Sequence, residues 1–192
     1  MTAVTVDATS TGKPALRRRL RQTRRDRLPD RDREAEATAL ADHVMALVDE
    51  RTGSRVCRVA AFESLPTEPP TQLLVQRLTS AGYEVVVPVT LPDRDLDWQV
   101  AGTTTPLGLN AIHDSEVVLV PALAADSDGN RLGQGGGSYD RALARRRPDA
   151  LLVVLLNDGE LLSAGEVPTE EHDIRVHIAV TPSGGAVRLV PA

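Results

Sequence analysis

Three short apolar runs constrain the fold of this chain most strongly. They occupy residues 83–90 (YEVVVPVT), 116–124 (EVVLVPALA) and 150–157 (ALLVVLLN), and each is dominated by Val, Leu or Ala. A strand that is buried on both faces gives a continuous apolar run of this kind, whereas a half-buried strand alternates apolar and polar residues. The runs therefore predict central strands of a sheet that is covered on both faces.

Amphipathic segments alternate with these runs. Leu40, Val44, Leu47 and Val48 lie at helical spacing within an expected helix over residues 31–51, and Pro14 suits the first turn of another helix over residues 14–28. Further helices are expected over residues 71–82 and 138–147, and further strands over 55–62, 95–100, 175–181 and 186–191, while most of 91–114 is expected to be a surface loop. Strands that alternate with helices predict an α/β fold with a mostly parallel sheet.

Composition limits what such a domain contains. Cys57 is the one cysteine, which excludes a disulfide within the chain and a thiolate metal cluster, and which fits a reducing cytoplasm. No apolar run approaches the roughly 20 residues of a membrane span. Residues 1–12 are expected to be a flexible tail without the pattern of a secretion signal, and residues 13–192 to form one domain.

An arginine-rich segment, residues 13–33, contains ten basic and three acidic residues in a chain whose net charge is −5. It could bind an anion or nucleic acid, or it could be a solvated helix face. A nucleic-acid-binding domain is usually basic overall and offers aromatic side chains for stacking. This chain is acidic and has four aromatic residues: Phe62, Tyr83, Trp98 and Tyr139. We therefore expect no nucleic-acid partner and mostly solvated arginines.

A second unusual segment is RLGQGGGSYDR, residues 131–141, in which four glycines fall within five residues. Glycine lets a backbone turn sharply and approach a ligand closely, so that successive N–H groups can surround an anion. The helix expected to follow would add its own free N–H groups. The segment lacks the Lys-Ser/Thr pair of a P-loop and the spacing of a dinucleotide fingerprint. It predicts a phosphate site, with a flexible surface loop as the alternative.

Residues 120–143, which include this glycine-rich segment, resemble the signature of the 5-formyltetrahydrofolate cyclo-ligase (methenyltetrahydrofolate synthetase) family. KPALRRRL (13–20), FESLPTEPPT (62–71) and PTEEHDIRVHIAVT (168–181) resemble further elements of that family, in the same order. The resemblance implies a three-layer α/β/α sandwich. It also implies an ATP- and Mg²⁺-dependent ligase that phosphorylates the formyl oxygen of 5-formyltetrahydrofolate, after which the N10 amine closes the ring to 5,10-methenyltetrahydrofolate.

The resemblance assigns roles to individual residues. Arg131 and Glu68 would be catalytic, and Asp140 and Asp173 would bind Mg²⁺, although a helix start and a simple turn explain these two aspartates equally simply. His172 would orient Asp173 or lie at the surface. ATP would contact Lys13, Arg17, Arg131, Gly133, Gln134, Gly135, Gly136, Gly137, Ser138 and Tyr139. The folate would contact Phe62, Glu63, Glu68, Gln134, Gly135, Gly136, Gly137 and Ser138.

The departures from the family pattern fall mainly on the folate side. Ser138 stands where the family usually has an aromatic residue, Glu63 where a small or apolar residue is expected, and Leu107 lies in a segment (106–112) that usually carries an aromatic residue and an acidic-proline pair. Gln134 and Gly136 are milder departures. The chain is thus a divergent cyclo-ligase or a paralogue that cyclises another amide or formamide. A non-catalytic nucleotide- or RNA-binding protein is a third alternative. A small-molecule substrate, no membrane contact and a cytoplasmic location are expected.

Overall fold

The computed structural model describes residues 12–170 and 173–190, so residues 1–11 of the expected tail lie outside the described part. Its centre is a seven-stranded sheet in the order β10-β9-β7-β4-β1-β2-β3. The strands are β1 (Arg58–Ala60), β2 (Glu84–Thr90), β3 (Leu96–Val100), β4 (Ser115–Pro121), β7 (Leu151–Leu155), β9 (Ile178–Thr181) and β10 (Gly185–Arg188). The five inner strands are parallel, whereas the edge strands β3 and β10 pair antiparallel.

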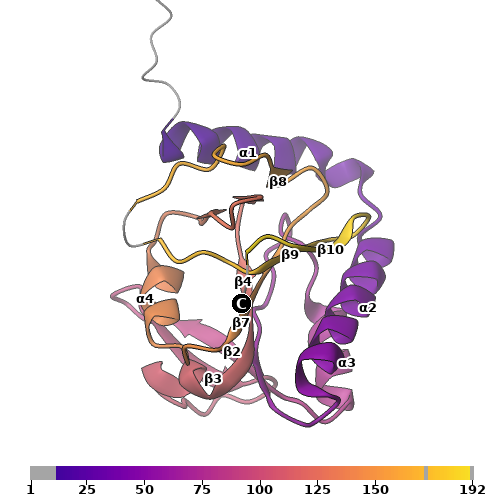
Figure 1. Ribbon diagram of the computed structural model, residues 1–192, viewed down its shortest axis with the longest axis vertical. Helices are drawn as coiled ribbons and strands as arrows, with labels where there is room; N and C mark the ends of the chain where they lie inside the picture. The colour runs from indigo at the N-terminus through magenta and orange to yellow at the C-terminus, as the bar shows by residue number, and fades with distance from the viewer. Residues whose placement is uncertain (1–11, 171–172, 191–192) are drawn as a thin grey trace, which may run out of the picture.

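Helices cover both faces of this sheet, as Figure 1 shows. On one face lie α2 (Arg33–Thr52) and α3 (Gln72–Ser80), whose apolar side chains share a core with Val59, Leu119 and Val153 of the sheet. On the other face lie the short helix α4 (Ser138–Ala144) and a 3₁₀ helix (Leu109–Asp114), which share a second core with Trp98 and Leu152. The predicted three-layer α/β/α sandwich is confirmed.

The first helix, α1 (Lys13–Arg27), lies across the ends of the strands rather than on a face (Figure 1). A small second sheet supports it, formed by β5 (Ala124–Asp126), β6 (Arg131–Leu132) and β8 (Leu161–Leu162). Leu20 of α1 packs with Leu123, Leu132 and Val167 in a third apolar cluster. A short 3₁₀ helix (Leu28–Asp30) then leads into α2, whose first turn Asp32 caps by accepting a hydrogen bond from the Ala35 N–H. The chain therefore places its arginine-rich segment beside the carboxyl ends of the strands.

Several expected elements differ in extent from the observed ones; the strand expected over 55–62, for example, spans only Arg58–Ala60. Within β2 the run 83–90 is buried only over Val85–Val87: Glu84 is exposed, and so is the far end of the strand at Thr90, where it forms a hairpin with β3. The run 116–124 is divided, since β4 ends at Pro121 and β5 begins a different sheet at Ala124. The helix expected over 138–147 ends at Ala144. The segment 91–114, expected to be mostly loop, also holds a 3₁₀ helix.

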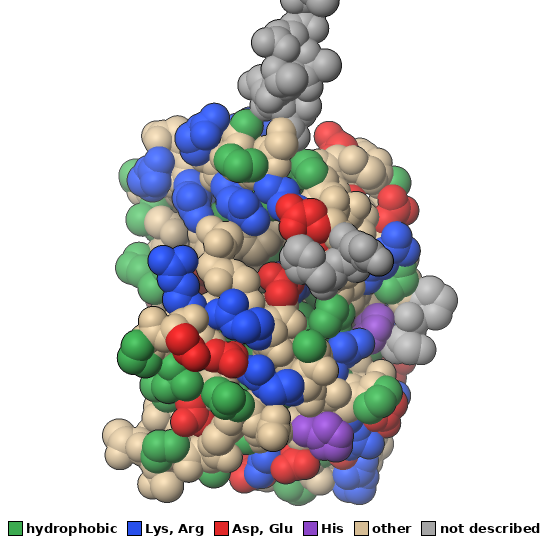
Figure 2. Space-filling model, turned by 90° about the vertical axis from the view of Figure 1, so that its left-hand side faces the viewer, with side chains coloured by type: hydrophobic (Ala, Val, Ile, Leu, Met, Phe, Trp, Pro, Cys, Tyr) green, Lys and Arg blue, Asp and Glu red, His purple; other side chains and the backbone are tan. Residues whose placement is uncertain are grey.

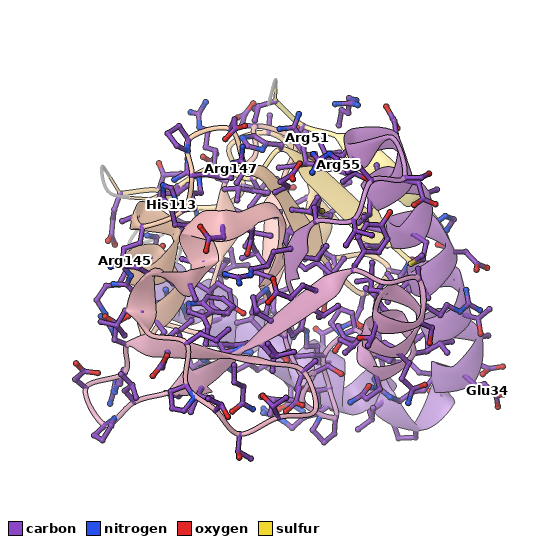
Figure 3. All side chains as sticks on the ribbon, turned by 90° about the horizontal axis from the view of Figure 1, so that it is seen from below. Glu34, Arg51, Arg55, His113, Arg145 and Arg147 are labelled. Atoms are coloured by element: carbon purple, nitrogen blue, oxygen red, sulfur yellow. The ribbon has the colours of Figure 1, made fainter. Side chains whose placement is uncertain are left out.

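Surface ion pairs lie at the opposite edge of the sheet, where the parallel strands begin. Figure 3 shows this edge, with Arg51, Arg55 and Arg147 on the same side of the view. Arg55 Nη2 lies 2.7 Å from a Glu116 carboxylate oxygen, and Arg147 Nε lies 2.7 Å from Asp149. Each of these arginines therefore has a carboxylate partner at an edge that lies away from the predicted site.

Candidate active site

A cavity of about 670 Å³ opens at the carboxyl edge of the sheet. Phe62, which follows β1, and Pro121, the last residue of β4, line it, as do Pro88 and Thr90 near the end of β2. The chain leaves β1 through α3 on one face and enters β4 from the 3₁₀ helix on the other face. Ligands of such sheets bind where the connections diverge in this way, beyond the carboxyl ends of the strands.

The structure brings every residue predicted for the site to this one cavity. They come from α1, from the loop of residues 62–71 (the Glu68 loop), from β6, from the glycine loop of residues 133–137, from α4 and from the C-terminal part of the chain. The predicted residues in its lining are Lys13, Arg17, Phe62, Glu63, Glu68, Arg131, Gly133, Gln134, Gly135, Gly136, Gly137, Ser138, Tyr139, Asp140 and Asp173. Lining residues that sequence reasoning missed are Pro14, Leu65, Pro88, Thr90, Leu96, Pro121 and Glu170.

The glycine loop adopts a backbone that other residues rarely adopt. Gly135 has φ +100° and Gly137 has φ +70°. A Cβ atom at Gly135 would also lie 3.4 Å from the Arg17 guanidinium. No backbone N–H of residues 134–137 donates a hydrogen bond to another described residue. A loop with exposed, unused N–H groups at the mouth of a cavity is suited to an anion.

Arg17 adds a positive charge beside this loop. Its Nε donates to the Gly133 carbonyl at 2.9 Å, and within the described residues no carboxylate lies within ion-pair distance of its guanidinium. Figure 2, which views the side on which α1 begins, shows Lys and Arg side chains gathered over the upper part of this face, with a few acidic ones among them. The charge of Arg17 is therefore available to a negatively charged ligand.

Arg131 and Tyr139 place two unsatisfied polar groups in the same wall. Arg131 is buried and forms an ion pair with Asp140, while its Nε has no hydrogen-bond partner. The buried hydroxyl of Tyr139 also lacks a partner in the described structure. Burial, and then the charge of Glu68, raise the pKa of Tyr139, so its hydroxyl stays protonated and can donate. Buried polar groups without partners are uncommon in folded proteins, and these two lie in one wall of the cavity.

Glu68 is the buried acid of the cavity, with 5% of its surface exposed. Its carboxylate accepts hydrogen bonds from the Leu65 N–H at 3.0 Å and from the Gln134 side-chain amide at 3.3 Å. Glu63 lines the same cavity but is exposed. Phe62 is almost fully buried, so most of its ring packs in the core rather than facing the cavity.

The two predicted magnesium ligands each contact a cation. Asp140 pairs with Arg131, and Asp173 accepts from Lys13 Nζ at 2.7 Å and from the Glu170 N–H. The described residues contain no group of three or more side chains placed to hold a metal ion. Magnesium usually keeps several waters and binds one or two carboxylates together with phosphate oxygens. Two hard oxygen donors that line the same cavity as the glycine loop fit that mode. His172 lies outside the described residues.

The folate-side departures lie in different places. Ser138 and Glu63 line the cavity, whereas Leu107 is exposed elsewhere, in a shallow depression with Arg58 and His113. No residue of the segment 106–112 lines the site cavity. Trp98 is fully buried in the core. The missing aromatic residue of that segment is thus no direct loss to the cavity seen here.

Known proteins share the sequence and the fold of this chain. Residues 9–182 match the model of the 5-formyltetrahydrofolate cyclo-ligase family. A 5-formyltetrahydrofolate cyclo-ligase of Mycolicibacterium smegmatis is 35% identical, over 92% of this chain and 97% of its own length, and that of Escherichia coli is 33% identical over 65% of this chain and 78% of its own. A 5,10-methenyltetrahydrofolate synthetase structure from Mycoplasma pneumoniae superimposes with a TM-score of 0.71 over 87% of this chain and 96% of that chain, at 18% identity. The chain therefore belongs to the 5-formyltetrahydrofolate cyclo-ligase family.

Proposed function

We propose that this protein converts 5-formyltetrahydrofolate to 5,10-methenyltetrahydrofolate at the expense of ATP. One observation carries the proposal: a single cavity at the carboxyl edge of the sheet is lined by Arg17, which has no carboxylate partner among the described residues, by a loop of unused N–H groups and by a buried carboxylate. Phosphoryl transfer depends mainly on positioning and charge neutralisation, which this set of groups can supply.

The reaction divides into two steps. The γ-phosphoryl group of ATP passes to the formyl oxygen, and ADP is released. The N10 amine then attacks the formyl carbon and loses its proton, and the carbon–oxygen bond breaks to release phosphate. The first step needs cations and N–H donors around phosphate oxygens, and the second needs an acceptor for the proton of the amine.

The residues of the cavity can be given these tasks. Arg17 and Lys13 from α1, with the N–H groups of the glycine loop, would hold the phosphates of ATP, and Arg131 would neutralise charge that develops on the transferred group. Glu68, which accepts hydrogen bonds in the structure, would orient the amine and take its proton. Tyr139 has a protonated hydroxyl with which to donate to the substrate.

We also propose that Asp140 and Asp173 hold Mg²⁺ when ATP is bound. The ion would supply charge neutralisation at the phosphate oxygens. Both carboxylates would then exchange a cationic partner in this chain, Arg131 or Lys13, for the metal.

Incubation of the protein with MgATP and 5-formyltetrahydrofolate tests the proposal. We expect the absorbance of the methenyl product to rise together with release of phosphate, and Asp140→Ala to abolish both. Asp128→Ala, which removes an exposed carboxylate outside the cavity lining, is the control and should retain turnover. Tight ATP binding without any folate turnover would contradict the proposal and favour another amide or formamide as substrate.

Two features bear on where the protein acts and on its partners. Within the described part of the chain, no helix combines the length and the apolar character needed to cross a membrane. The single thiol, Cys57, is free and buried. We propose a cytoplasmic enzyme with a reduced folate as substrate and no nucleic-acid partner, and the contacts of the arginine-rich segment support the last point.

A further inference from the structure

Arg21 of the arginine-rich segment reaches the site through Gln134. Its Nε donates to Gln134 Oε1 at 3.1 Å and its Nη2 donates to the Gln134 main-chain carbonyl at 2.6 Å. Because Arg21 holds the oxygen of the side-chain amide, the NH₂ group is left to face the other way. It donates to Glu68 Oε1 at 3.3 Å. Arg21 thereby sets which end of the amide meets the Glu68 carboxylate.

A second arginine holds Glu68 by its main chain. Arg33 Nη1, at the first turn of α2, donates to the Glu68 carbonyl at 2.9 Å. The preceding carbonyl, of Thr67, accepts from Arg31 Nη1 at 3.2 Å and from Asn157 Nδ2 at 3.3 Å. Both carbonyls therefore accept hydrogen bonds from side chains at the start of α2 or just before it, and the Thr67 carbonyl accepts a further one from the turn after β7. The main chain of the Glu68 loop is therefore held by hydrogen bonds from Arg33, Arg31 and Asn157.

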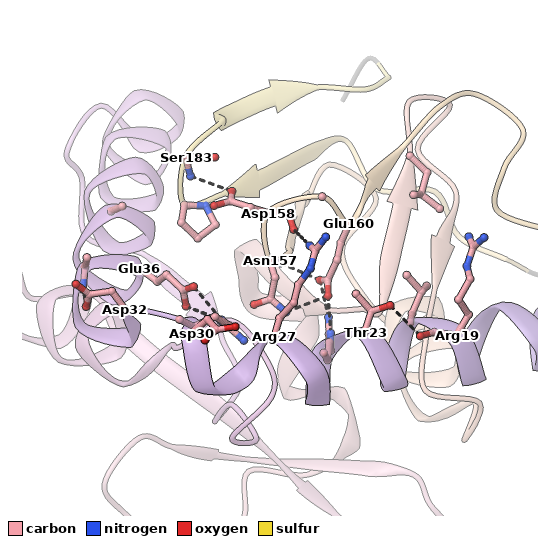
Figure 4. A pocket seen from close by; sticks show the side chains of 18 residues that line it. Arg19, Thr23, Arg27, Asp30, Asp32, Glu36, Asn157, Asp158, Glu160 and Ser183 are labelled. Atoms are coloured by element: carbon pink, nitrogen blue, oxygen red, sulfur yellow. Dashed lines mark hydrogen bonds and ion pairs between the residues drawn. The ribbon is translucent and has the colours of Figure 1, made fainter.

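The side chains behind the loop border a second cavity of about 620 Å³, shown in Figure 4. It lies between α1, the start of α2 and the turn of residues 157–160, and Arg31 and Asn157 line it. Arg31 is itself held by Glu36, with Nη2 2.5 Å from Oε2. The loop thus turns the Glu68 carboxylate toward the site cavity and a Thr67 carbonyl toward the walls of the second.

We propose that Arg21 and Arg33 are positioning residues for Glu68, Arg21 acting through the Gln134 amide and Arg33 through the Glu68 carbonyl. The proposal rests on the proposed function, in which Glu68 orients the N10 amine and takes its proton. A small displacement of such a group lowers the rate strongly, because the reaction depends on the alignment of the reacting atoms. The arginine-rich segment then positions the Glu68 carboxylate, in addition to the proposed contact of Arg17 with phosphate.

Steady-state kinetics of Arg33→Ala and Arg21→Ala test the proposal. The free energy of one hydrogen bond from a charged group corresponds to about a tenfold to hundredfold change in a rate or equilibrium constant. We expect Arg33→Ala to lower kcat/KM for 5-formyltetrahydrofolate by about that factor, while the affinity for ATP measured alone stays within about twofold. Arg33→Lys should recover part of the loss, since its ammonium can still donate to the carbonyl. Arg21→Ala should weaken both, because Arg21 also holds the main chain of the glycine loop.

Arg25→Ala is the matched control. It removes the same charge from the same segment, and among the described residues the Arg25 guanidinium donates to Gln22, one turn earlier in α1. Its kinetics should equal those of the unchanged protein. Wild-type kinetics for Arg33→Ala would overturn the proposal. So would equal losses of ATP affinity and folate turnover in Arg33→Ala with a lowered melting temperature, because that pattern indicates a structural role alone.

Amide hydrogen exchange provides a readout that does not depend on turnover. Exchange in residues 62–71 should accelerate in Arg33→Ala relative to Arg25→Ala, with residues 133–137 unaffected. Unchanged exchange in the Glu68 loop would overturn the positioning role even if the enzyme is active. If the unchanged protein fails to turn over 5-formyltetrahydrofolate, the proposed function fails, and this measurement still decides whether Arg33 positions the loop.

Discussion

At the scale of single residues, the cavity wall owes its form to a buried cation and its partner. The Arg131 side chain is 4% exposed, and the side chain of its ion-pair partner Asp140 is 27% exposed. A buried charge without its counter-charge is costly, so the carboxylate has a structural task before any metal binds. The same position was predicted from sequence as a metal ligand, but its arginine partner nine residues earlier could not be assigned, because residues 131 and 140 belong to different elements.

Asp140→Asn should separate these two tasks. We expect the free energy of unfolding to fall by about 3 kcal/mol, since the buried guanidinium loses its counter-charge but keeps a polar neighbour. Urea denaturation measures the loss, and Asp128→Asn serves as the control. Unchanged stability together with lost turnover would assign Asp140 to metal binding alone.

A second prediction at this scale concerns the glycine loop. Gly135→Val should lower ATP affinity by at least tenfold, because a β-branched residue is strained at positive φ and would meet Arg17. Gly102→Val is the matched control, since Gly102 also has positive φ (+80°) but has open space around it and lies outside the cavity lining. Calorimetric titration with ATP distinguishes them. Equal ATP affinity in both variants would refute the anion site.

At the scale of elements, the central strands were predictable and the connections less so. Continuous apolar runs predicted β2, β4 and β7 because burial on both faces leaves a clear pattern in the sequence. The hairpin of β2 with β3 was harder to predict, since its end is exposed and its pairing depends on tertiary contacts such as the Arg145–Asp95 ion pair. The 3₁₀ helix at Leu109–Asp114 has no amphipathic repeat long enough to recognise.

Between two strands, His177 makes the sheet sensitive to pH. Its Nδ1 accepts the Leu152 N–H at 3.0 Å, which requires a neutral ring, and burial followed by the charges of Arg146 and Arg51 lowers its pKa. The folded state therefore binds fewer protons, and its stability falls as the pH drops below the unfolded pKa of about 6.5. His177→Asn, which keeps an acceptor but does not titrate, should flatten this fall.

Urea midpoints measured between pH 8 and pH 5 would show the difference for His177→Asn. His113→Asn changes an exposed histidine and should leave the decline of the unchanged protein in place. Parallel curves for His177→Asn and the unchanged protein would show that His177 does not couple folding to pH.

At the scale of the whole molecule, the site lies where α1 contacts the rest of the fold, and we call this contact the α1 joint. Sequence reasoning located its parts through similarity to a family, but interpreted most of the arginine-rich segment as solvated. That interpretation is wrong for Arg21, Arg24, Arg31 and Arg33, whose guanidiniums bind loop carbonyls or buried carboxylates. Arg24, for example, donates to Ala122 O and pairs with Glu160. Such partners are far away in sequence, so no local pattern reveals them.

Loosening this joint should weaken nucleotide binding as a consequence of lost packing. Leu20→Ala, in the cluster that anchors α1, should lower the free energy of unfolding by about 2–3 kcal/mol and reduce ATP affinity as well. Leu40→Ala, in the core under α2, should cost as much stability or more and leave ATP affinity unchanged. Melting curves with and without ATP test both variants, and an equal ATP-induced stabilisation in each would contradict the idea.

The order in which the chain is synthesised gives this joint a further consequence. The carbonyl that Arg17 contacts lies 116 residues later, and the carboxylate that Lys13 contacts lies 160 residues later. During synthesis, residues 13–27 therefore leave the ribosome well before residues 133 and 173, with which they pair in the folded protein, have been translated. The cavity that Lys13 and Arg17 line is therefore completed only after residue 173 has been translated.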